Sequence, residues 1–318
     1  MEGVFAWLDQ PLFQDGFLRM WMAIAAGAGL VLVLLLILVL VGKRKRNKRK
    51  EKMETQQDNQ HPVTETTEKP VPLPVLELAN LQGIGSREEQ QDAFGISRLE
   101  RLETDGLLAV LCDGMGGLAE GGMIAAQTAA EMIGIFPWED DADVPEWVRQ
   151  RSRRVYQQFR GHGGTTLVAA LLRGKSLSFW CVGDSDLFLL REEKLYALNV
   201  RQEFKNDLVL RALDGAFPVG EAFTDPQAGA LSEYIGKEDV SCDCTCMPFA
   251  LQPEDALLLC SDGVSDTLTL KQIREAMALP PQACCDKLEE EILAAGKPGQ
   301  DNYTAIAMKY HGKKEEAE

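Results

Sequence analysis

The feature that most constrains this chain is an apolar run at residues 20–42, which reads MWMAIAAGAGLVLVLLLILVLVG and carries no charge. A helix needs about 20 apolar residues to cross the core of a bilayer, so the run predicts a single transmembrane helix. The basic stretch KRKRNKRK follows directly, and basic flanks favour the cytoplasmic side of a membrane. We therefore expect a single-pass protein of the cell membrane, with residues 1–19 as a short extracytoplasmic N-terminus and the remainder in the cytoplasm.

Three segments follow the apolar run. Residues 43–74 join the basic stop-transfer stretch to a sequence that is rich in Glu, Gln, Thr and Pro and poor in large apolar residues. This composition cannot bury a core and is typical of a flexible linker. Residues 75–312 have the composition of a globular domain and are numerous enough to enclose a substantial core. Residues 313–318 form a charged tail.

The overall composition limits the classes of function. The formal net charge is −16, and many of the basic residues that are present gather beside the apolar run, so general nucleic-acid binding is not expected. The 8 Cys are too few for a fold stapled by disulfides. The 3 His are too few for a His-rich dinuclear metal site, so a metal site in this chain must use oxygen ligands.

Apolar runs and turn residues predict a domain of mixed secondary structure. Strands are expected at residues 107–112, 165–172, 177–182, 187–191, 194–198, 256–260 and 303–310. Helices are expected at residues 121–135, 145–159, 270–278 and 281–295. Residues 205–229 show no clear period. Because strands and helices do not alternate strictly, the fold class is expected to be α+β and not a parallel doubly wound sheet.

Five Asp residues stand at or near the ends of predicted strands, most of them beside Gly or Asn: Asp92, Asp113, Asp184, Asp262 and Asp301. A single Asp-Gly pair is a common turn. Several Asp residues at strand ends indicate a metal site, because Mg²⁺ and Mn²⁺ take oxygen ligands and several carboxylates must converge to hold them. Two such ions about 3.5–4 Å apart lower the pKa of water and clamp a phosphoryl oxygen. The sequence therefore predicts a dinuclear site for hard divalent cations.

In the residues that carry these carboxylates, the sequence resembles the metal-dependent protein phosphatases of type 2C, in their bacterial Ser/Thr form. The motifs are, in order, Arg87 with Gln91 and Asp92; Asp113-Gly114-Met115-Gly116-Gly117; Gly163-Gly164-Thr165-Thr166; Val182-Gly183-Asp184-Ser185; Ser261-Asp262-Gly263; and Asp301-Asn302. The resemblance extends over the whole domain from residue 75. It implies a four-layered α-β-β-α sandwich, here preceded by the transmembrane helix, with the metals between the sheets.

The resemblance also implies catalytic roles. Asp113 would be the ligand that bridges two Mn²⁺ or Mg²⁺ ions, and Gly114 would offer its carbonyl oxygen to the second ion. Arg87 would bind the substrate phosphate, and a guanidinium suits this role because its planar fork meets two phosphate oxygens at once.

The remaining metal ligands follow from the same resemblance. Asp262 and Asp301 would complete the shell of the first ion, and Asp92 would act through a bound water. Asp184, with help from Asp262, would hold a labile third ion. Asn302 would support the site by hydrogen bonding.

The sequence departs from the family pattern at two positions in these motifs. Met115 stands where eukaryotic members have a His, as it commonly does in bacterial members. Asp186 stands where members usually have Arg, and we expect this change to alter a local ion pair and not the metal ligands.

Three closely spaced cysteines, Cys242, Cys244 and Cys246, alternate with other residues. The alternation favours an exposed strand. A site for a soft metal is the alternative, although no partnering Cys or His pair is near in the sequence.

Two classes of function remain open. The first is a membrane-anchored, Mn²⁺- or Mg²⁺-dependent phosphatase that acts on phosphoserine and phosphothreonine of cytoplasmic proteins and opposes a Ser/Thr kinase. A related enzyme would dephosphorylate an anti-sigma-factor antagonist. The second is a non-catalytic scaffold of the same fold that binds phosphoproteins. The clustered carboxylates favour an enzyme, because like charges that converge are costly without cations between them.

Overall fold

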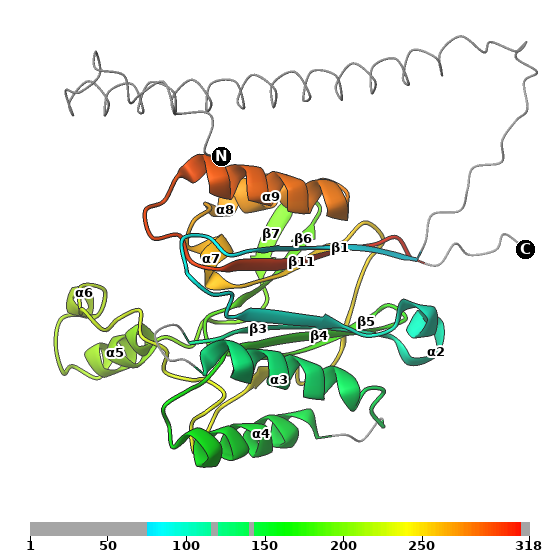
Figure 1. Cartoon of the computed structure of the whole chain (residues 1–318). Coiled ribbons are helices and arrows are strands. Elements are labelled where there is room, and N and C mark those ends of the chain that lie inside the picture. Colours follow the sequence, from blue (N-terminus) through cyan, green and yellow to red (C-terminus); the bar gives the residue numbers. More distant parts are fainter. Residues whose placement is uncertain (1–74, 116–119, 140–142, 313–318) are drawn as a thin grey trace, which may run out of the picture. The chain divides into compact units, whose positions relative to one another are not determined.

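A computed structural model describes residues 75–115, 120–139 and 143–312 of the chain (Figure 1). The predicted span at residues 20–42, the segments on either side of it and the tail at residues 313–318 lie outside the described residues. None of the helices within the described ranges is both long enough and apolar enough to cross a membrane.

The described residues form two antiparallel sheets that face each other. The first sheet has the strand order β1-β11-β10-β6-β7, with β1 Leu76–Gly83, β11 Tyr303–Tyr310, β10 Ala256–Cys260, β6 Asp186–Arg191 and β7 Lys194–Ala197. The second has the order β2-β3-β4-β5-β8, with β9 also on β5; the bounds are β2 Asp92–Ile96, β3 Leu107–Asp113, β4 Leu167–Arg173, β5 Ser176–Val182, β8 Asp243–Cys244 and β9 Phe249–Ala250. The inner faces of the two sheets share one apolar core.

Helices cover the outer face of each sheet, as Figure 1 shows. α8 (Leu270–Met277) and α9 (Pro281–Ala295) pack on the first sheet, and α3 (Gly121–Gly134) and α4 (Val144–Phe159) pack on the second, each over its own apolar core. The predicted α+β class and its four layers, α-β-β-α, are therefore confirmed. The smaller helical segments are η3 Leu99–Arg101, α2 Leu102–Asp105, α5 Phe204–Leu213, α6 Val219–Ala222 and α7 Asp262–Ser265.

Local sequence explains most of these elements. β3 is a continuous apolar run because both of its faces are buried, one under α3 and one against the other sheet. α4 begins where Asp143 accepts a hydrogen bond from the backbone N–H of Glu146 at 2.9 Å, with a Pro in the first turn. β11 and α9 have the bounds that the sequence predicts.

β1 and β2 are absent from the predicted strands. β1 carries polar Asn80 and Gln82 among its apolar residues, and β2 is only DAFGI, so neither has a strong period of two. Their pairing with β11 and β3 decides their conformation.

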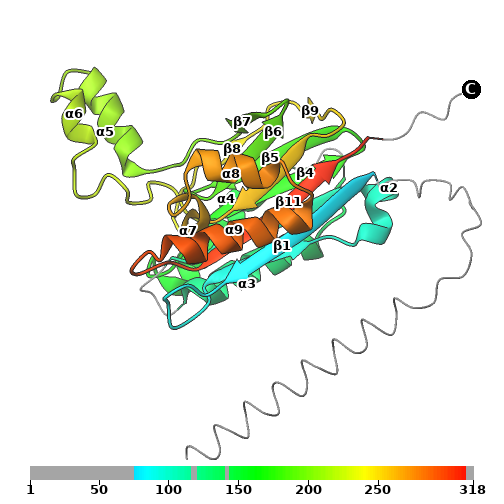
Figure 2. The same ribbon diagram turned by 90° about the horizontal axis from the view of Figure 1, so that it is seen from above.

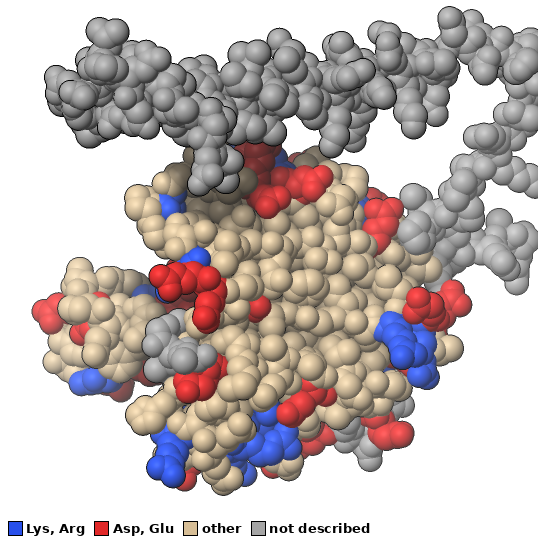
Figure 3. Space-filling view, viewed as in Figure 1, with Lys and Arg blue, Asp and Glu red and all other residues tan. Residues whose placement is uncertain are grey.

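Residues 204–230 form a lobe, here called the flap, that contains α5 and α6. Figure 2 shows it projecting away from the layers. Only Leu208 and Ala212 of α5 are buried, whereas Leu210, Leu213 and Phe223 are exposed, and the lobe is mostly uncharged in Figure 3. A helix that buries so little of its apolar surface has no clear amphipathic period, which is why the sequence did not reveal it.

Candidate active site

Asp92 and Asp113 are brought together by strand register. Asp92 begins β2, Asp113 ends β3, and the two are direct partners in the antiparallel pair. Like charges directly opposite each other destabilise such a pair. Asp92 is also only 5% exposed, and its carboxylate accepts a hydrogen bond from the hydroxyl of Ser261 at 2.8 Å. The fold therefore keeps two carboxylates together at a cost that a cation would offset.

The Gly-Gly-Thr-Thr segment holds the backbone around Asp113. The hydroxyl of Thr166 accepts a hydrogen bond from the N–H of Asp113 at 2.9 Å, and the N–H of Thr166 donates to the Asp113 carbonyl at 2.8 Å. The hydroxyl of Thr165 donates to the same carbonyl at 2.8 Å. Gly114 lies against Gly121 so closely that a Cβ would overlap backbone atoms. The motif thus fixes the orientation of Asp113 at the end of β3.

Asp262 is the first residue of α7, and only Ser261 separates it from the end of β10. The adjoining Ser261 accepts the N–H of Thr304 at 3.0 Å, which ties this turn to β11. Gly263 packs on the backbone of Asn302, so the Ser-Asp-Gly and Asp-Asn turns touch. This contact places Asp262 beside the segment that carries Asp301.

Arg87 and Asp301 form an ion pair, with 2.5 Å between Nη2 and Oδ2. Asn302 holds the loop on which Arg87 lies: its Nδ2 donates to the carbonyls of Ile84 and Glu89, and its Oδ1 accepts the N–H of Gln91 at 2.8 Å. Both Arg87 and Asp301 are partly exposed. The structure therefore brings the predicted phosphate-binding residue to a predicted metal ligand, and Asn302 supports the site as expected.

Burial and mutual repulsion raise the pKa values of four carboxyl groups. Burial is the largest cause for each. For Asp113, Asp262 and Asp184 the second cause is repulsion by neighbouring carboxylates. The pKa of Asp113 rises well above its ordinary value, that of Asp262 rises to about 6 and that of Asp184 rises to about 7. The pKa of Asp92 is also raised by burial. Asp301 contributes to the repulsion felt by Asp92, Asp113 and Asp262. All five predicted carboxylates thus belong to one electrostatic cluster.

This donor set fits hard divalent cations. One buried oxygen of Asp92 and one of Asp262 receive no hydrogen bond from the described residues, and carboxylate oxygens are the ligands that such ions prefer. Within the described ranges, however, no three His, Cys, Asp or Glu side chains have the arrangement needed to hold a metal ion as they stand. Repulsion acts over longer distances than ligation, so the five carboxylates can share one electrostatic cluster without ligating geometry, and Asp301 is paired with Arg87.

Comparison with known proteins now identifies the domain. A family model described as Protein phosphatase 2C matches residues 83–296. The chain belongs to the protein phosphatase 2C family. This confirms the resemblance stated for the motifs and the predicted class, a metal-dependent protein phosphatase.

Bacterial relatives match the same domain. Serine/threonine protein phosphatase PstP of Mycobacterium tuberculosis is 30% identical over 209 residues, which are 63% of this chain but only 39% of PstP. Protein phosphatase PhpP of Streptococcus pneumoniae is 29% identical over 249 residues, which are 73% of this chain and 96% of PhpP. A crystal structure of the catalytic domain of PstP in complex with two manganese ions has a TM-score of 0.57 at 26% identity and covers 74% of this chain and 98% of that domain. The predicted dependence of this phosphatase on Mn²⁺ or Mg²⁺ agrees with that structure.

Some residues of this phosphatase site were not found from the sequence. Ser261 and Thr166 lie within the family motifs, but their hydrogen bonds to Asp92 and Asp113 follow only from the fold. Gly116 and Gly117 lie outside the described residues. Arg201, which contacts Asp186, belongs to no motif.

The structure shows where the three closely spaced cysteines lie. Cys244 lies in the two-residue strand β8, Cys242 is half-buried beside it and Cys246 is exposed. The predicted strand therefore holds for Cys244 alone, since Cys242 and Cys246 lie outside β8. No group of three metal-holding side chains lies among these cysteines in the described part of the chain.

Metal removal should affect the stability of this phosphatase in a pH-dependent way. The raised pKa values of Asp262 and Asp184 mean that the folded state binds protons more strongly than the unfolded state, for which the ordinary value is 3.8. The resulting penalty is absent below about pH 4 and grows as the pH rises through the folded values of about 6 and about 7. Bound cations offset it. We expect Mn²⁺ to raise the melting temperature more at about pH 7.5 than at about pH 5, measured by scanning fluorimetry against a chelator control. Equal shifts at both pH values would contradict this.

Proposed function

We propose that this chain is a membrane-anchored phosphatase that hydrolyses phosphoserine and phosphothreonine on cytoplasmic proteins. The observation that carries the proposal is the cluster of five carboxylates with Arg87 at its edge. PstP is a Ser/Thr protein phosphatase and PhpP is a protein phosphatase, so both support a phosphoprotein substrate and PstP supports phosphoserine and phosphothreonine. An opposing Ser/Thr kinase is the partner that this activity requires.

Different residues of the chain would bind the cations and orient a water. Asp113, Asp262 and Asp301, with the carbonyl of Gly114, would hold two cations, and Asp92 would orient a water beside them. When bound, such cations supply Lewis acidity toward a phosphoryl oxygen and lower the pKa of a water.

Arg87 would bind the phosphate of the substrate. Its guanidinium now pairs with Asp301, and a phosphate group offers the same bidentate acceptor geometry as a carboxylate. Because the side chain is 46% exposed, it can exchange one partner for the other without unfolding its loop. The ion pair thus keeps the guanidinium of Arg87 at the edge of the site before the substrate binds.

Hydrolysis of phosphopeptides tests this activity. The purified full chain in detergent, supplied with Mn²⁺, should release phosphate from a phosphothreonine peptide, and a chelator should abolish the release. A phosphotyrosine peptide of the same sequence serves as the specificity control. Binding of the phosphothreonine peptide without any release of phosphate would reject the enzyme and favour the scaffold.

The proposed membrane anchor requires a separate test, since residues 20–42 lie outside the described part of the chain. The uncharged length of this run and the basic stretch after it support a single span with the domain in the cytoplasm. In cells, the chain should sediment with membranes, resist carbonate extraction and expose its C-terminus only to cytoplasmic protease. Release from membranes by carbonate would contradict the anchor.

A further inference from the structure

A short segment grips the turn that carries Asp184. Residues 199–203, here called the strap, lead from β7 into the flap. The side chain of Asn199 donates to the carbonyl of Ser185 in the turn at 2.9 Å and accepts the N–H of Leu187 in β6 at 2.8 Å. Gln202 also bonds the turn twice, through its backbone N–H and through its side chain, each at 2.8 Å. The strap therefore holds both sides of the turn between β5 and β6.

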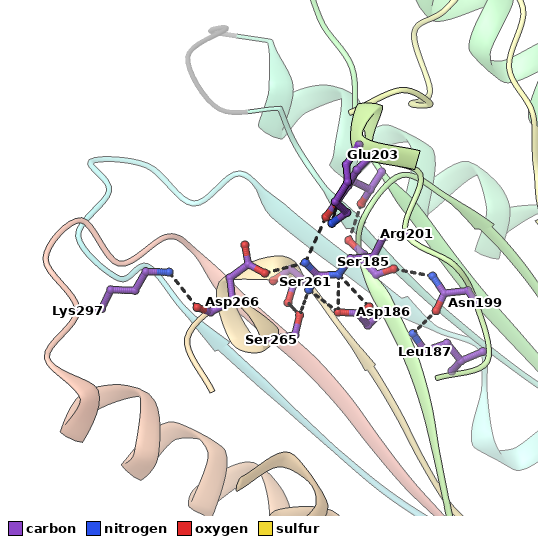
Figure 4. A network of polar contacts seen from close by, with 12 residues as sticks. Ser185, Asp186, Leu187, Asn199, Arg201, Glu203, Ser261, Ser265, Asp266 and Lys297 are labelled. Carbon is purple, nitrogen blue, oxygen red and sulfur yellow. Dashed lines mark hydrogen bonds and ion pairs between the residues drawn. The ribbon is translucent and has the colours of Figure 1, made fainter. Parts of the chain in front are cut away.

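Arg201, between these two residues, joins three elements (Figure 4). Its Nε and Nη2 meet both carboxylate oxygens of Asp186 at 2.7–3.2 Å. Nη2 also donates to the hydroxyl of Ser265 at 2.6 Å, and Nη1 donates to Asp266 at 2.7 Å. Glu203 completes the set at 3.6 Å from Nη1. The planar guanidinium suits this role because its donors are fixed in one fork.

These contacts join the two loops that carry carboxylates of the site. Asp186 follows Asp184 by two residues and begins β6. Ser265 ends α7, whose first residue is Asp262. Because β6 and β10 are neighbours in the sheet, the two loops leave adjacent strand ends. Arg201 bridges these loops and so limits their separation.

The charge on Arg201 is needed where it lies. Asp186 is 5% exposed, and every ion pair that it makes within the described ranges is with Arg201. A buried carboxylate that loses its only cation is strongly destabilised. Such an uncompensated charge would also lie two residues from Asp184, whose negative charge it would repel.

The same residue stands at the base of the flap. The carbonyl of Arg201 accepts a hydrogen bond from Asn206 at 2.6 Å. The flap closes on itself immediately beyond, where the N–H of Phe204 donates to the carbonyl of Ala230 at 2.8 Å. A change at Arg201 is therefore transmitted both to the loops of the site and to the flap.

We propose that Arg201 is a positioning residue that holds the loop of Asp184 against the helix of Asp262 and joins both to the flap. The proposal rests on the proposed function and deepens it. Arg201 lies outside the motifs, yet it would set the distance between two carboxylates, Asp184 and Asp262, that would bind cations. It also accounts for Asp186, which stands where members of the family usually have Arg: the positive charge of this region comes from the strap.

β6 provides a matched control at its other end. Arg191 pairs with Asp255 through two bonds, at 2.9 and 2.5 Å, and Asp255 is 2% exposed. The side chains of Arg191 and Arg201 are 22% and 24% exposed. The two arginines thus make comparable ion pairs at the two ends of β6, but only Arg201 lies beside the carboxylate cluster.

The test compares Arg201→Ala, Arg201→Lys and Arg191→Ala in the full chain. Calorimetric titration of Mn²⁺ into the metal-free protein should show affinity weakened by about tenfold or more in Arg201→Ala, and by less than about twofold in Arg191→Ala. Both Ala variants should lower the melting temperature. Arg201→Lys keeps the charge but cannot meet all three elements, so its Mn²⁺ affinity should fall between those of wild type and Arg201→Ala. With a phosphothreonine peptide, KM should rise in Arg201→Ala and stay unchanged in Arg191→Ala.

Two results would overturn the proposal: Mn²⁺ affinity in Arg201→Ala within about twofold of wild type, or equal weakening in Arg191→Ala. If Arg201→Ala does not fold, Arg201→Lys decides, and wild-type Mn²⁺ affinity in that variant rejects the positioning role. The proposed function fails separately, when the wild type with Mn²⁺ releases no phosphate. The Mn²⁺ titrations still decide the role of Arg201 in that case.

Discussion

Asp113→Asn should lower kcat for a phosphothreonine peptide by about a thousandfold while the domain stays folded. Asn has nearly the shape of Asp, and the backbone bonds to Thr165 and Thr166 do not involve the side chain. The lost charge is the one that interacts with all four other carboxylates of the cluster. Phosphate release and circular dichroism, measured on the same preparation, check both parts of the expectation.

Thermal unfolding gives a second readout for this variant. Without metal, Asp113→Asn should melt at or above the wild-type temperature, because it removes a repelled buried charge. With Mn²⁺, the stabilisation that we expect in wild type should largely disappear. Asp286→Asn, on the exposed side of α9, is the control for a charge change that leaves kcat and the Mn²⁺ effect intact. A fully active Asp113→Asn variant would contradict the assignment of the site.

Gly263→Ala should lower both stability and activity. A Cβ at this position would overlap the carbonyl oxygen of Asn302, which is backbone and cannot rotate away. Overpacking of this kind costs about 1–3 kcal/mol, which for a domain of this size lowers the melting temperature by about 2–12 °C. The two turns must also separate, which displaces Asp262 from Asp301. We expect kcat/KM to fall by about a hundredfold at temperatures where the variant is folded.

Gly134→Ala is the matched control for that substitution. Gly134 ends α3, and a Cβ there meets no atom within 4 Å. This change should be neutral or stabilising by about 0.5–1 kcal/mol, because Ala favours a helix more than Gly does. Scanning calorimetry and phosphopeptide hydrolysis on both variants separate close packing from a general effect of adding a methyl group. Gly263→Ala with wild-type melting and activity would refute the close contact.

Sequence patterns were sufficient to predict an element where its own residues determine its conformation. β3 is an apolar run that ends in Asp113, and β10 is an apolar run that ends two residues before Asp262, so each strand leads to a carboxylate of the cluster. α9 has a Pro start and a Gly end, and its bounds were predicted correctly. The roles of the site residues followed from the resemblance of their motifs to the family. The fold then brings the carboxylates together, because the end of one strand lies beside the start of its antiparallel neighbour, as Asp113 of β3 lies beside Asp92 of β2.

Sequence patterns were insufficient to predict an element or a contact that depends on a partner far away in the sequence. β2 is a strand because β3 lies beside it, and no local period in its five residues shows this. Arg201 meets Asp186 across a hairpin and Asp266 across the sheet, 65 residues along the chain. A charged residue without a motif gives no sign of such partners. The contact between Gly263 and Asn302 likewise depends on packing in three dimensions.

The pairing of the first strand with the last has a consequence for biosynthesis. Gln82 and Thr304 are partners in register, yet they are 222 residues apart along the chain. β11 lies between β1 and β10, so the first sheet stays open until the end of the domain has left the ribosome. Contacts of such long range slow folding and leave apolar edges exposed in the nascent chain. Translation that stops before residue 303 would therefore leave β1 without its neighbour and yield a product for proteolysis, not a smaller working domain.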